Sequence, residues 1–258
     1  MKLHDHEETF HELVAFTSGY KKIPERAVVR DYFITMVLLN LSSSPFKLQC
    51  VLKGGTSLSK CHGDSIRRFS EDIDLSVTHP IRLGKKKISD HLKFIETTLS
   101  EGFQTQIESE NRNFRNKSSF LWKEEEENRI KLEIGFVDEH PDHSLQITKS
   151  YIQEYLEHRG LHEDAALYDL HSFEILAQDI HITFWEKLFA LKHHAFERSL
   201  PRQVRHIHDV VTLYRHFREL IFSGKDELDK KTIQRVKKTT DSYYAKRSIE
   251  RTIKMVDP

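Results

Sequence analysis

Apolar and polar residues follow two different periods along the chain, and the change of period near residue 147 separates two halves. In the first half, residues 25–41 place apolar side chains at helical spacing, and the serines and proline at 42–45 predict the end of that helix. The run 46–53 is rich in strand-forming residues and stops at two glycines, which predicts a strand, a tight turn and a short helix. Residues 72–77, DIDLSV, alternate with a period of two and predict a strand with one solvated face.

The remaining patterns predict a mixed first half and a helical second half. In the first half we expect an amphipathic helix that starts at Lys85 and closes at Gly102, and strands over 103–110 and 128–137. The helices predicted in the second half cover residues 149–160, 181–198, 208–220 and 226–255. The pattern therefore predicts an α+β protein, with a mixed sheet and flanking helices in residues 1–145 and a C-terminal helical bundle domain in residues 146–258.

Composition and charge narrow the class of protein. With 258 residues, of which 38% are hydrophobic, the chain can bury a substantial core. The 40 Lys and Arg residues balance the 40 Asp and Glu residues, so the net charge does not indicate a polyanionic partner. Cys50 and Cys61 are too few for a disulfide framework, and we expect both to be reduced. The N-terminus lacks the apolar core of a signal peptide and no apolar run reaches the ~18 residues of a membrane span, so we expect a cytoplasmic protein without membrane contact.

The C-terminal tail carries a local surplus of positive charge. Residues 225–254 contain ten Lys and Arg residues against five Asp and Glu residues. Such a surplus can follow the phosphate backbone of a nucleic acid. A solvated helix face explains the same residues equally well.

Two carboxylates are predicted to leave the same face of the 72–77 strand. Asp72 and Asp74 have Cα atoms about 6–7 Å apart, whereas Ile73 and Leu75 point to the opposite face. Unpaired, the two charges would repel each other by on the order of a few kcal/mol, a cost that a cation between them removes. Oxygen-only ligands favour Mg²⁺, which completes its shell with waters and substrate phosphates. The alternative is an edge strand whose outer face is acidic.

The residues before this strand provide a candidate phosphate site. Gly54 and Gly55 follow a predicted strand and precede a helix, where backbone N–H groups and a helix N-terminus bind phosphate. Thr56 and Ser57 add hydroxyl donors at the same place. Most Gly-Gly pairs are ordinary turns. This turn, however, lies sixteen residues before the Asp-x-Asp strand, so it predicts a phosphate site next to a metal site.

A third acid is a candidate metal ligand. Glu133 lies between Leu132 and Ile134 on another predicted strand of the same half. Two-metal phosphoryl chemistry uses such an acid to help hold the metal that activates the attacking hydroxyl. The alternative is a surface glutamate opposite a buried pair. Together with the turn and the paired aspartates, Glu133 favours phosphoryl-transfer chemistry.

Several motifs resemble one group of enzymes. Gly-Gly followed by [DE]-apolar-[DE]-apolar and a later apolar-[DE]-apolar strand is similar to the pattern of the polymerase-β-like nucleotidyltransferase superfamily. The stretches LKGGTSLSK, RFSEDIDLS, TFWEKLFALKHHA and RHIHDVVTLY, between Lys53 and Tyr214, resemble the AbiEii/AbiGii (MenT-like) toxin nucleotidyltransferases of bacterial abortive-infection and toxin–antitoxin systems. The resemblance implies a nucleotidyltransferase-like mixed sheet with flanking helices, followed by a helical domain.

The resemblance also implies roles for individual residues. Residues that match the family's triphosphate-binding turn are Gly54, Gly55, Thr56 and Ser57, and those that match its Mg²⁺-binding acids are Asp72 and Asp74. In the helical half, Lys187 matches a lysine that contacts the nucleotide phosphates, and Asp209 matches a later aspartate. The residues around Asp209 depart from the family pattern, since Ile207-His208 replace frequent aromatics. The alternatives are a solvated Lys187 and an ordinary surface salt bridge between Arg205 and Asp209.

These observations and the resemblance predict a nucleotidyltransferase of the EC 2.7.7 type. It would transfer NMP from an NTP to an acceptor hydroxyl with two Mg²⁺ ions, for which Mn²⁺ is an alternative. The implied acceptor is the 3′ end of tRNA, and the implied role is growth arrest as a toxin with a cognate antitoxin protein. The alternatives are an enzyme that AMPylates or UMPylates a protein hydroxyl, and a catalytically silent nucleotide- or protein-binding module.

Overall fold

The protein is described from a computed structural model, which covers residues 2–63, 65–66, 68–123, 125–197, 199–222, 230–242 and 244–245. The chain divides into two compact units. The first contains Met1–Gly63 and Arg68–Ala177, and the second contains Asp64–Arg67 and Gln178–Pro258. Within the described ranges, none of the helices has the length and apolar character needed to cross a membrane.

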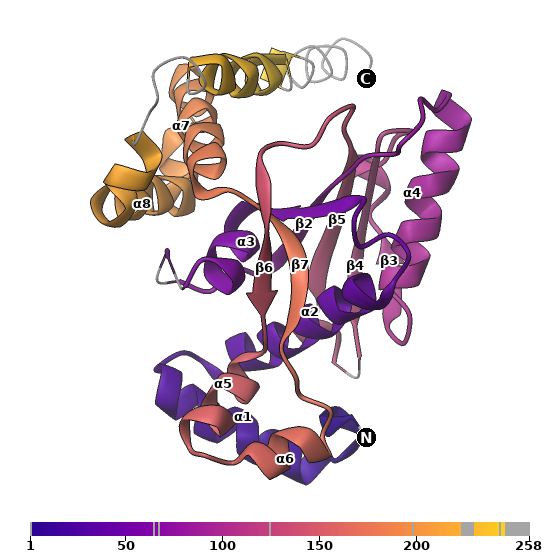
Figure 1. The fold of residues 1–258 in the computed structure, drawn as a ribbon, viewed down its shortest axis with the longest axis vertical. Helices are drawn as coiled ribbons and strands as arrows, with labels where there is room; N and C mark the ends of the chain where they lie inside the picture. The colour runs from indigo at the N-terminus through magenta and orange to yellow at the C-terminus, as the bar shows by residue number, and fades with distance from the viewer. Residues whose placement is uncertain are drawn as a thin grey trace. The chain divides into compact units, whose positions relative to one another are not determined.

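A mixed sheet of seven strands forms the centre of the first unit (Figure 1). The strand order is β3-β4-β5-β2-β1-β7-β6. Strand β2 runs antiparallel to β1 and parallel to β5, so it has a hydrogen-bonded neighbour on each side. The strands are β1 (Cys50–Lys53), β2 (Asp72–Val77), β3 (Gln104–Ile107), β4 (Asn116–Trp122), β5 (Ile130–Phe136), β6 (His143–Thr148) and β7 (Phe173–Gln178). Because β2 is the middle strand, the edge-strand explanation of its acidic residues is wrong.

Helices of the first unit pack against the sheet and against one another. Helix α4 contacts β4 and β5, and α2 contacts β5. Helices α1, α5 and α6 lie together beside α2 (Figure 1). The helices are α1 (Glu7–Lys21), α2 (Glu25–Ser43), α3 (Gly54–Cys61), α4 (Lys85–Leu99), α5 (Tyr151–His158) and α6 (His162–Leu167), with short 3-10 helices η1 (Leu3–Asp5), η2 (Ser109–Asn111) and η3 (Glu126–Asn128).

Apolar residues of α2 and of β2 belong to the same core. Helix α2 begins after Pro24, and its residues Val28 and Val37 are fully buried. Ile73 and Leu75 of β2 lie in the same cluster. Burying a side chain of this size stabilises a fold by about 1.5–3 kcal/mol. The face of β2 opposite its aspartates is therefore anchored in the core.

The sequence pattern predicted an all-helical second half, and this prediction is wrong. Strand β6 extends beyond residue 147, and β7 pairs in parallel with β1, with Ala177 opposite Leu52. In β7 the buried residues Phe173, Ile175 and Ala177 alternate, but the strand is only six residues long and lies between two helical stretches. Because α5, α6 and β7 belong to the first unit, the compact units divide at Ala177, whereas we expected a division at residue 145.

Two helices account for most of the described residues of the second unit. They are α7 (Ile180–Phe196) and α8 (Val204–Phe222), which contact each other and are joined through η4 (Leu200–Arg202). Residues 230–242 are also helical, as predicted for the tail. The rest of the basic tail, residues 225–229 and most of 243–254, lies outside the described residues.

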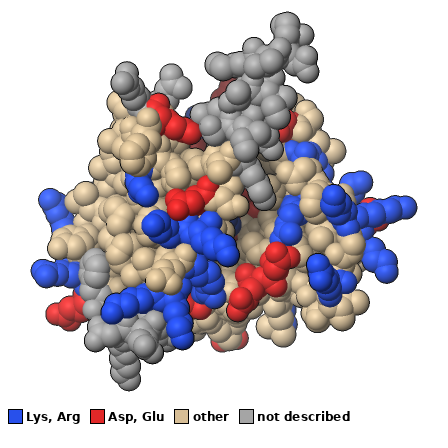
Figure 2. Space-filling view, turned by 90° about the horizontal axis from the view of Figure 1, so that it is seen from above, with Lys and Arg blue, Asp and Glu red and all other residues tan. Residues whose placement is uncertain are grey.

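Charged residues of both signs are exposed on the surface. Figure 2 shows Lys and Arg side chains interspersed with Asp and Glu side chains on one face, and neither sign covers that face alone.

Candidate active site

The turn between β1 and α3 brings a glycine against the acidic strand. The antiparallel register of β1 and β2 pairs Lys53 with Asp74. Gly54 has a φ of +74°, a conformation that residues with a side chain rarely adopt. A Cβ atom at this position would lie 2.7 Å from Oδ2 of Asp74. Glycine is therefore needed here both for the backbone conformation and for the close approach of the Asp74 carboxylate.

The second glycine of the turn is covered by the segment that precedes β2. A Cβ atom on Gly55 would lie 2.6 Å from Oγ of Ser70 and 3.1 Å from a guanidinium nitrogen of Arg68. The Arg68 guanidinium also donates a hydrogen bond of 3.0 Å to the Phe69 carbonyl. Sequence analysis gave Ser70 no binding role and gave Arg68 only as a charge that balances the acids or meets the substrate, although both stand in the RFSEDIDLS motif directly before the acids. Their position places a positive charge and a hydroxyl beside the turn.

The hydroxyl residues of the turn are buried in the protein. Thr56 and Ser57 have exposed fractions of 1% and 0%. The Thr56 hydroxyl donates to the backbone carbonyl of Asp72, which ties α3 to the start of β2. The Ser57 Oγ atom has no hydrogen-bond partner in the described part of the chain. Of the two hydroxyls predicted to bind phosphate, that of Thr56 is thus bonded to the backbone, and that of Ser57 is a buried polar atom without a partner there.

The acids of β2 and β5 lie side by side because these strands are parallel neighbours. The register places Asp74 directly opposite Glu133. Burial raises the pKa of Asp74 to about 7; Lys53 opposes this rise, and Glu133 and Asp72 add to it. Asp72 is exposed at the start of the strand. At neutral pH Asp74 therefore retains a proton for part of the time, unless a cation compensates its charge.

Glu133 also has a cationic neighbour. The Lys131 ammonium lies 2.6 Å from Oε1 of Glu133 and 3.0 Å from a carboxylate oxygen of Glu108. Burial lowers the pKa of Lys131, but these two carboxylates outweigh burial and raise it overall. Among the described residues, no group of three or more His, Cys, Asp or Glu side chains is arranged to hold a metal ion. The three predicted metal ligands therefore lie on neighbouring strands, and their metal-binding role stays a prediction.

The third acid of the EDID sequence faces another partner. Glu71 forms an ion pair of 2.9 Å with Arg30 of α2. The Arg30 side chain is 9% exposed, and it also donates a hydrogen bond of 2.9 Å to the Glu127 carbonyl. Glu71 therefore connects the start of β2 to α2.

The two predicted site residues of the second unit contact each other. Nζ of Lys187, on α7, lies 3.0 Å from Oδ2 of Asp209, on α8. The Asp209 side chain is fully buried and that of Lys187 is 10% exposed. Lys187 is therefore not the solvated lysine of the alternative interpretation, and Asp209 has a buried partner on another helix.

Comparison with known proteins identifies the family. The family model described as "Nucleotidyl transferase AbiEii toxin, Type IV TA system" matches residues 37–254, which is most of the chain. The chain belongs to the AbiEii family. Among solved structures, MenT4, a nucleotidyltransferase toxin from Mycobacterium tuberculosis H37Rv, is similar over 88% of both chains, with 17% sequence identity and a TM-score of 0.48. Comparison with curated proteins gave no match.

Membership in the AbiEii family makes the protein a nucleotidyltransferase of the type IV toxin–antitoxin class. In this AbiEii chain, the first unit brings the turn at Gly54 close to Asp74, and the register of β2 and β5 places Glu133 opposite Asp74. The second unit brings Lys187 and Asp209 together. The prediction of a nucleotidyltransferase toxin of this family is confirmed, and the roles of the individual residues are proposals.

Proposed function

We propose that the protein transfers NMP from an NTP to an acceptor hydroxyl, with Mg²⁺ as cofactor and pyrophosphate as the second product. The observation that carries the proposal is the close approach of the Gly54 turn to Asp74, which lies opposite Glu133 on the neighbouring strand. The turn follows β1 and the two carboxylates lie on β2 and β5 of the same sheet, and this proximity supports the proposal. Phosphoryl transfer needs both features close together.

The turn supplies the phosphate-binding part of the site. The first residues of α3 have backbone N–H groups without partners inside the helix, and the helix dipole adds partial positive charge. Gly54 and Gly55 would let the phosphates approach the backbone closely, because they have no side chain in the way. Arg68, within 3.1 Å of the position of a Gly55 Cβ, would add a full positive charge. Thr56 would fix the turn through its bond to Asp72, and the Ser57 hydroxyl would donate to the phosphates.

The acids of β2 and β5 have the donor chemistry that a divalent cation prefers. They offer only oxygen donors. Burial, and then the nearby Glu133 and Asp72, raise the pKa of Asp74, and a cation would stabilise its ionised form. Asp72, Asp74 and Glu133 would hold Mg²⁺, with Mn²⁺ as the alternative metal. When bound, the metal would lower the pKa of the acceptor hydroxyl and stabilise charge on the leaving pyrophosphate.

The second unit contributes a proposed phosphate contact. Lys187 would neutralise charge on the nucleotide phosphates, as a point charge on a flexible stem can do. Its ion pair with the buried Asp209 would restrict the directions in which the ammonium can point. Asp209 would thereby act on the substrate through Lys187.

We infer the acceptor and the biological role from the resemblance of the sequence motifs. The acceptor would be the 3′ end of tRNA, and transfer to it would arrest growth. A type IV toxin works with a cognate antitoxin, so an antitoxin protein would be the second partner.

The proposal is tested by labelling. The purified protein is incubated with each α-³²P-labelled NTP and Mg²⁺, Mn²⁺ or EDTA, in the presence of total RNA and total protein of a bacterial extract. We expect label that depends on the divalent metal and is removed by nuclease. Asp74→Asn should lose at least about 10²-fold in rate, whereas Asp138→Asn, which changes an 86% exposed carboxylate, should keep the wild-type rate.

Two other outcomes distinguish the remaining possibilities. Label that is removed by protease and resists nuclease would replace RNA with a protein hydroxyl as the acceptor. Absence of label with all four NTPs, or labelling that Asp74→Asn leaves intact, would contradict the proposed function and favour a silent binding module.

A further inference from the structure

Two adjacent residues of helix α2 each form an ion pair with a segment that carries the candidate site. Arg30 pairs with Glu71, directly before β2, at 2.9 Å. Asp31 pairs with Lys60, near the C-terminal end of α3, at 2.6 Å. The proposed reaction assigns no task to any of these four residues.

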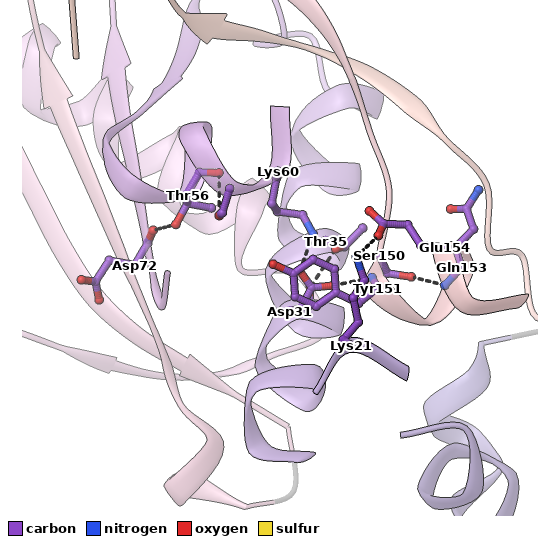
Figure 3. A network of polar contacts seen from close by, with 11 residues as sticks. Lys21, Asp31, Thr35, Thr56, Lys60, Asp72, Ser150, Tyr151, Gln153 and Glu154 are labelled. Atoms are coloured by element: carbon purple, nitrogen blue, oxygen red, sulfur yellow. Dashed lines mark hydrogen bonds and ion pairs between the residues drawn. The ribbon is translucent and has the colours of Figure 1, made fainter. Parts of the chain in front are cut away.

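Asp31 is a buried carboxylate whose two oxygens both accept hydrogen bonds (Figure 3). Its side chain is 1% exposed. Oδ1 accepts from the Lys60 ammonium at 2.6 Å, and Oδ2 accepts from the backbone N–H of Tyr151 at 2.7 Å. Tyr151 is the first residue of α5, so this bond satisfies one of the N–H groups that a helix start leaves open. Asp31 therefore joins α2 to both α3 and α5.

Lys60 is as deeply buried as its partner. Its side chain is 2% exposed, and its ammonium lies 5.2 Å from the centre of the Tyr151 ring. Figure 3 shows Lys60 extending from α3 toward Asp31 and Tyr151. A cation near a helix C-terminus also interacts favourably with the helix dipole. A buried charge of this kind is costly unless it is paired, so the pair forms a fixed contact between α2 and α3.

Helix α3 depends on such contacts for its position. It has eight residues, and helices of this length are marginal on their own in water. Near its first turn, the Thr56 hydroxyl bonds to the Asp72 carbonyl. Near its last turn, Lys60 bonds to Asp31. The direction of the helix, and with it the direction of the N–H groups in its first turn, is therefore set from both ends.

Arg30 fixes the acidic strand from the same helix. The Arg30 side chain is 9% exposed, and its guanidinium bonds both to the Glu71 carboxylate and to the Glu127 carbonyl. Glu71 immediately precedes Asp72, so this contact restrains the start of β2. Consecutive residues of α2 thus hold the two segments whose relative position defines the site in the first unit.

We propose that α2 aligns the phosphate turn with the acidic strand, and that Asp31 and Lys60 are positioning residues for the NTP phosphates. The proposal rests on the proposed function, because the phosphate site is the turn at the other end of α3. Loss of the Lys60 contact would let α3 tilt about its Thr56 end. A misplacement on the order of 1 Å at reacting groups costs about 10²-fold in rate.

The test compares Lys60→Met with Glu96→Gln as a matched control. Lys60→Met keeps most of the apolar stem and removes the ammonium. Glu96→Gln weakens a bidentate ion pair with Arg112, of 2.6 and 2.8 Å, which lies in the same unit but does not involve α3. Both variants should lower the melting temperature. Only Lys60→Met should raise KM for the NTP, by about tenfold or more, and speed hydrogen exchange at residues 54–61.

The outcomes separate this proposal from the proposed function. Hydrogen exchange is measured without nucleotide, so it tests the positioning role independently of activity. If the wild-type protein transfers no nucleotide, only the proposed function is overturned. Unchanged exchange at residues 54–61, or an equal rise of KM in both variants, would overturn the positioning role. If Lys60→Met does not fold, Asp31→Asn is measured in the same way with the same expected result, because it keeps an acceptor for the Tyr151 N–H.

Discussion

Replacement of Gly54 by alanine tests the contact on which the candidate site depends. Gly54 has a φ of +74°, and a Cβ atom there would lie 2.7 Å from Oδ2 of Asp74. Gly54→Ala should therefore have two separable effects. The first is a loss of stability from the backbone conformation, and the second is a displacement of the Asp74 carboxylate.

The structure sets the size of both effects. An alanine in the left-handed region costs roughly 1–2 kcal/mol, which lowers the melting temperature of a protein of this size by about 2–8 °C. Ordinary contacts begin near 3.4 Å, so the Asp74 oxygen must move by about 0.7 Å from its 2.7 Å position. Since misplacement of this order costs about 10²-fold in rate, we expect nucleotidyl transfer to fall by one to two orders of magnitude.

Gly160→Ala is the matched control. Gly160 has a φ of +73°, and a Cβ atom there would meet no atom within 4 Å. Both variants should lose similar stability by thermal unfolding, but only Gly54→Ala should lose activity in the labelling assay. Equal transfer rates in the two variants would refute the role of the Gly54–Asp74 contact. A much larger loss of stability in Gly54→Ala would mean that Asp74 cannot move and that the turn distorts instead.

Two further predictions concern other buried charges. Lys187→Met should destabilise the protein by about 3–5 kcal/mol, because it removes the ammonium that lies 3.0 Å from the buried Asp209 carboxylate. The double variant Lys187→Met/Asp209→Leu should regain stability in thermal unfolding without regaining nucleotidyl transfer, and recovery of transfer would contradict the proposed role of Lys187. Burial, followed by the charge of His143, lowers the pKa of His140 to about 4 in the folded protein. Between pH 6.5 and 4 the His140 side chain therefore binds a proton in the unfolded chain but not in the folded one. The free energy of unfolding falls as the pH falls through that window. In His140→Gln, urea titrations at pH 7 and pH 4.5 should show a smaller loss of stability than in the wild type, and an identical loss would contradict a neutral His140 in the folded state.

The elements that carry the candidate site were predictable because their signals are local. The alternation in DIDLSV gave the bounds of β2, and the glycines after a β-rich run gave the start of α3. Strands β4, β6 and β7 were not predicted. In β7 every second residue is buried, but its six residues follow a helical stretch and precede another, so the short alternation was not distinguished from them.

The candidate site itself was predicted only in part, since its supporting contacts depend on the order of the strands. Asp74 and Glu133 become neighbours because β2 and β5 pair in parallel, a register that no local pattern specifies. Arg68 and Ser70 adjoin the turn because the chain returns past Gly55 before β2 begins. Their side chains are ordinary surface types in the sequence, and only the fold shows what they touch.

Helix α2 shows why a residue near a motif can be read wrongly without the fold. Lys60 stands in SLSKCHG, where a lysine normally predicts an exposed position, yet its side chain is 2% exposed because Asp31 compensates its charge. Glu71 stands in the acidic motif of the sequence, but its carboxylate pairs with Arg30 of α2. A pair of buried charges is weak evidence for stability, because well-packed apolar residues often stabilise a fold at least as well. The ion pairs instead restrict how α3 and the start of β2 are placed relative to α2. These two segments meet where the Gly54 turn lies against Asp74.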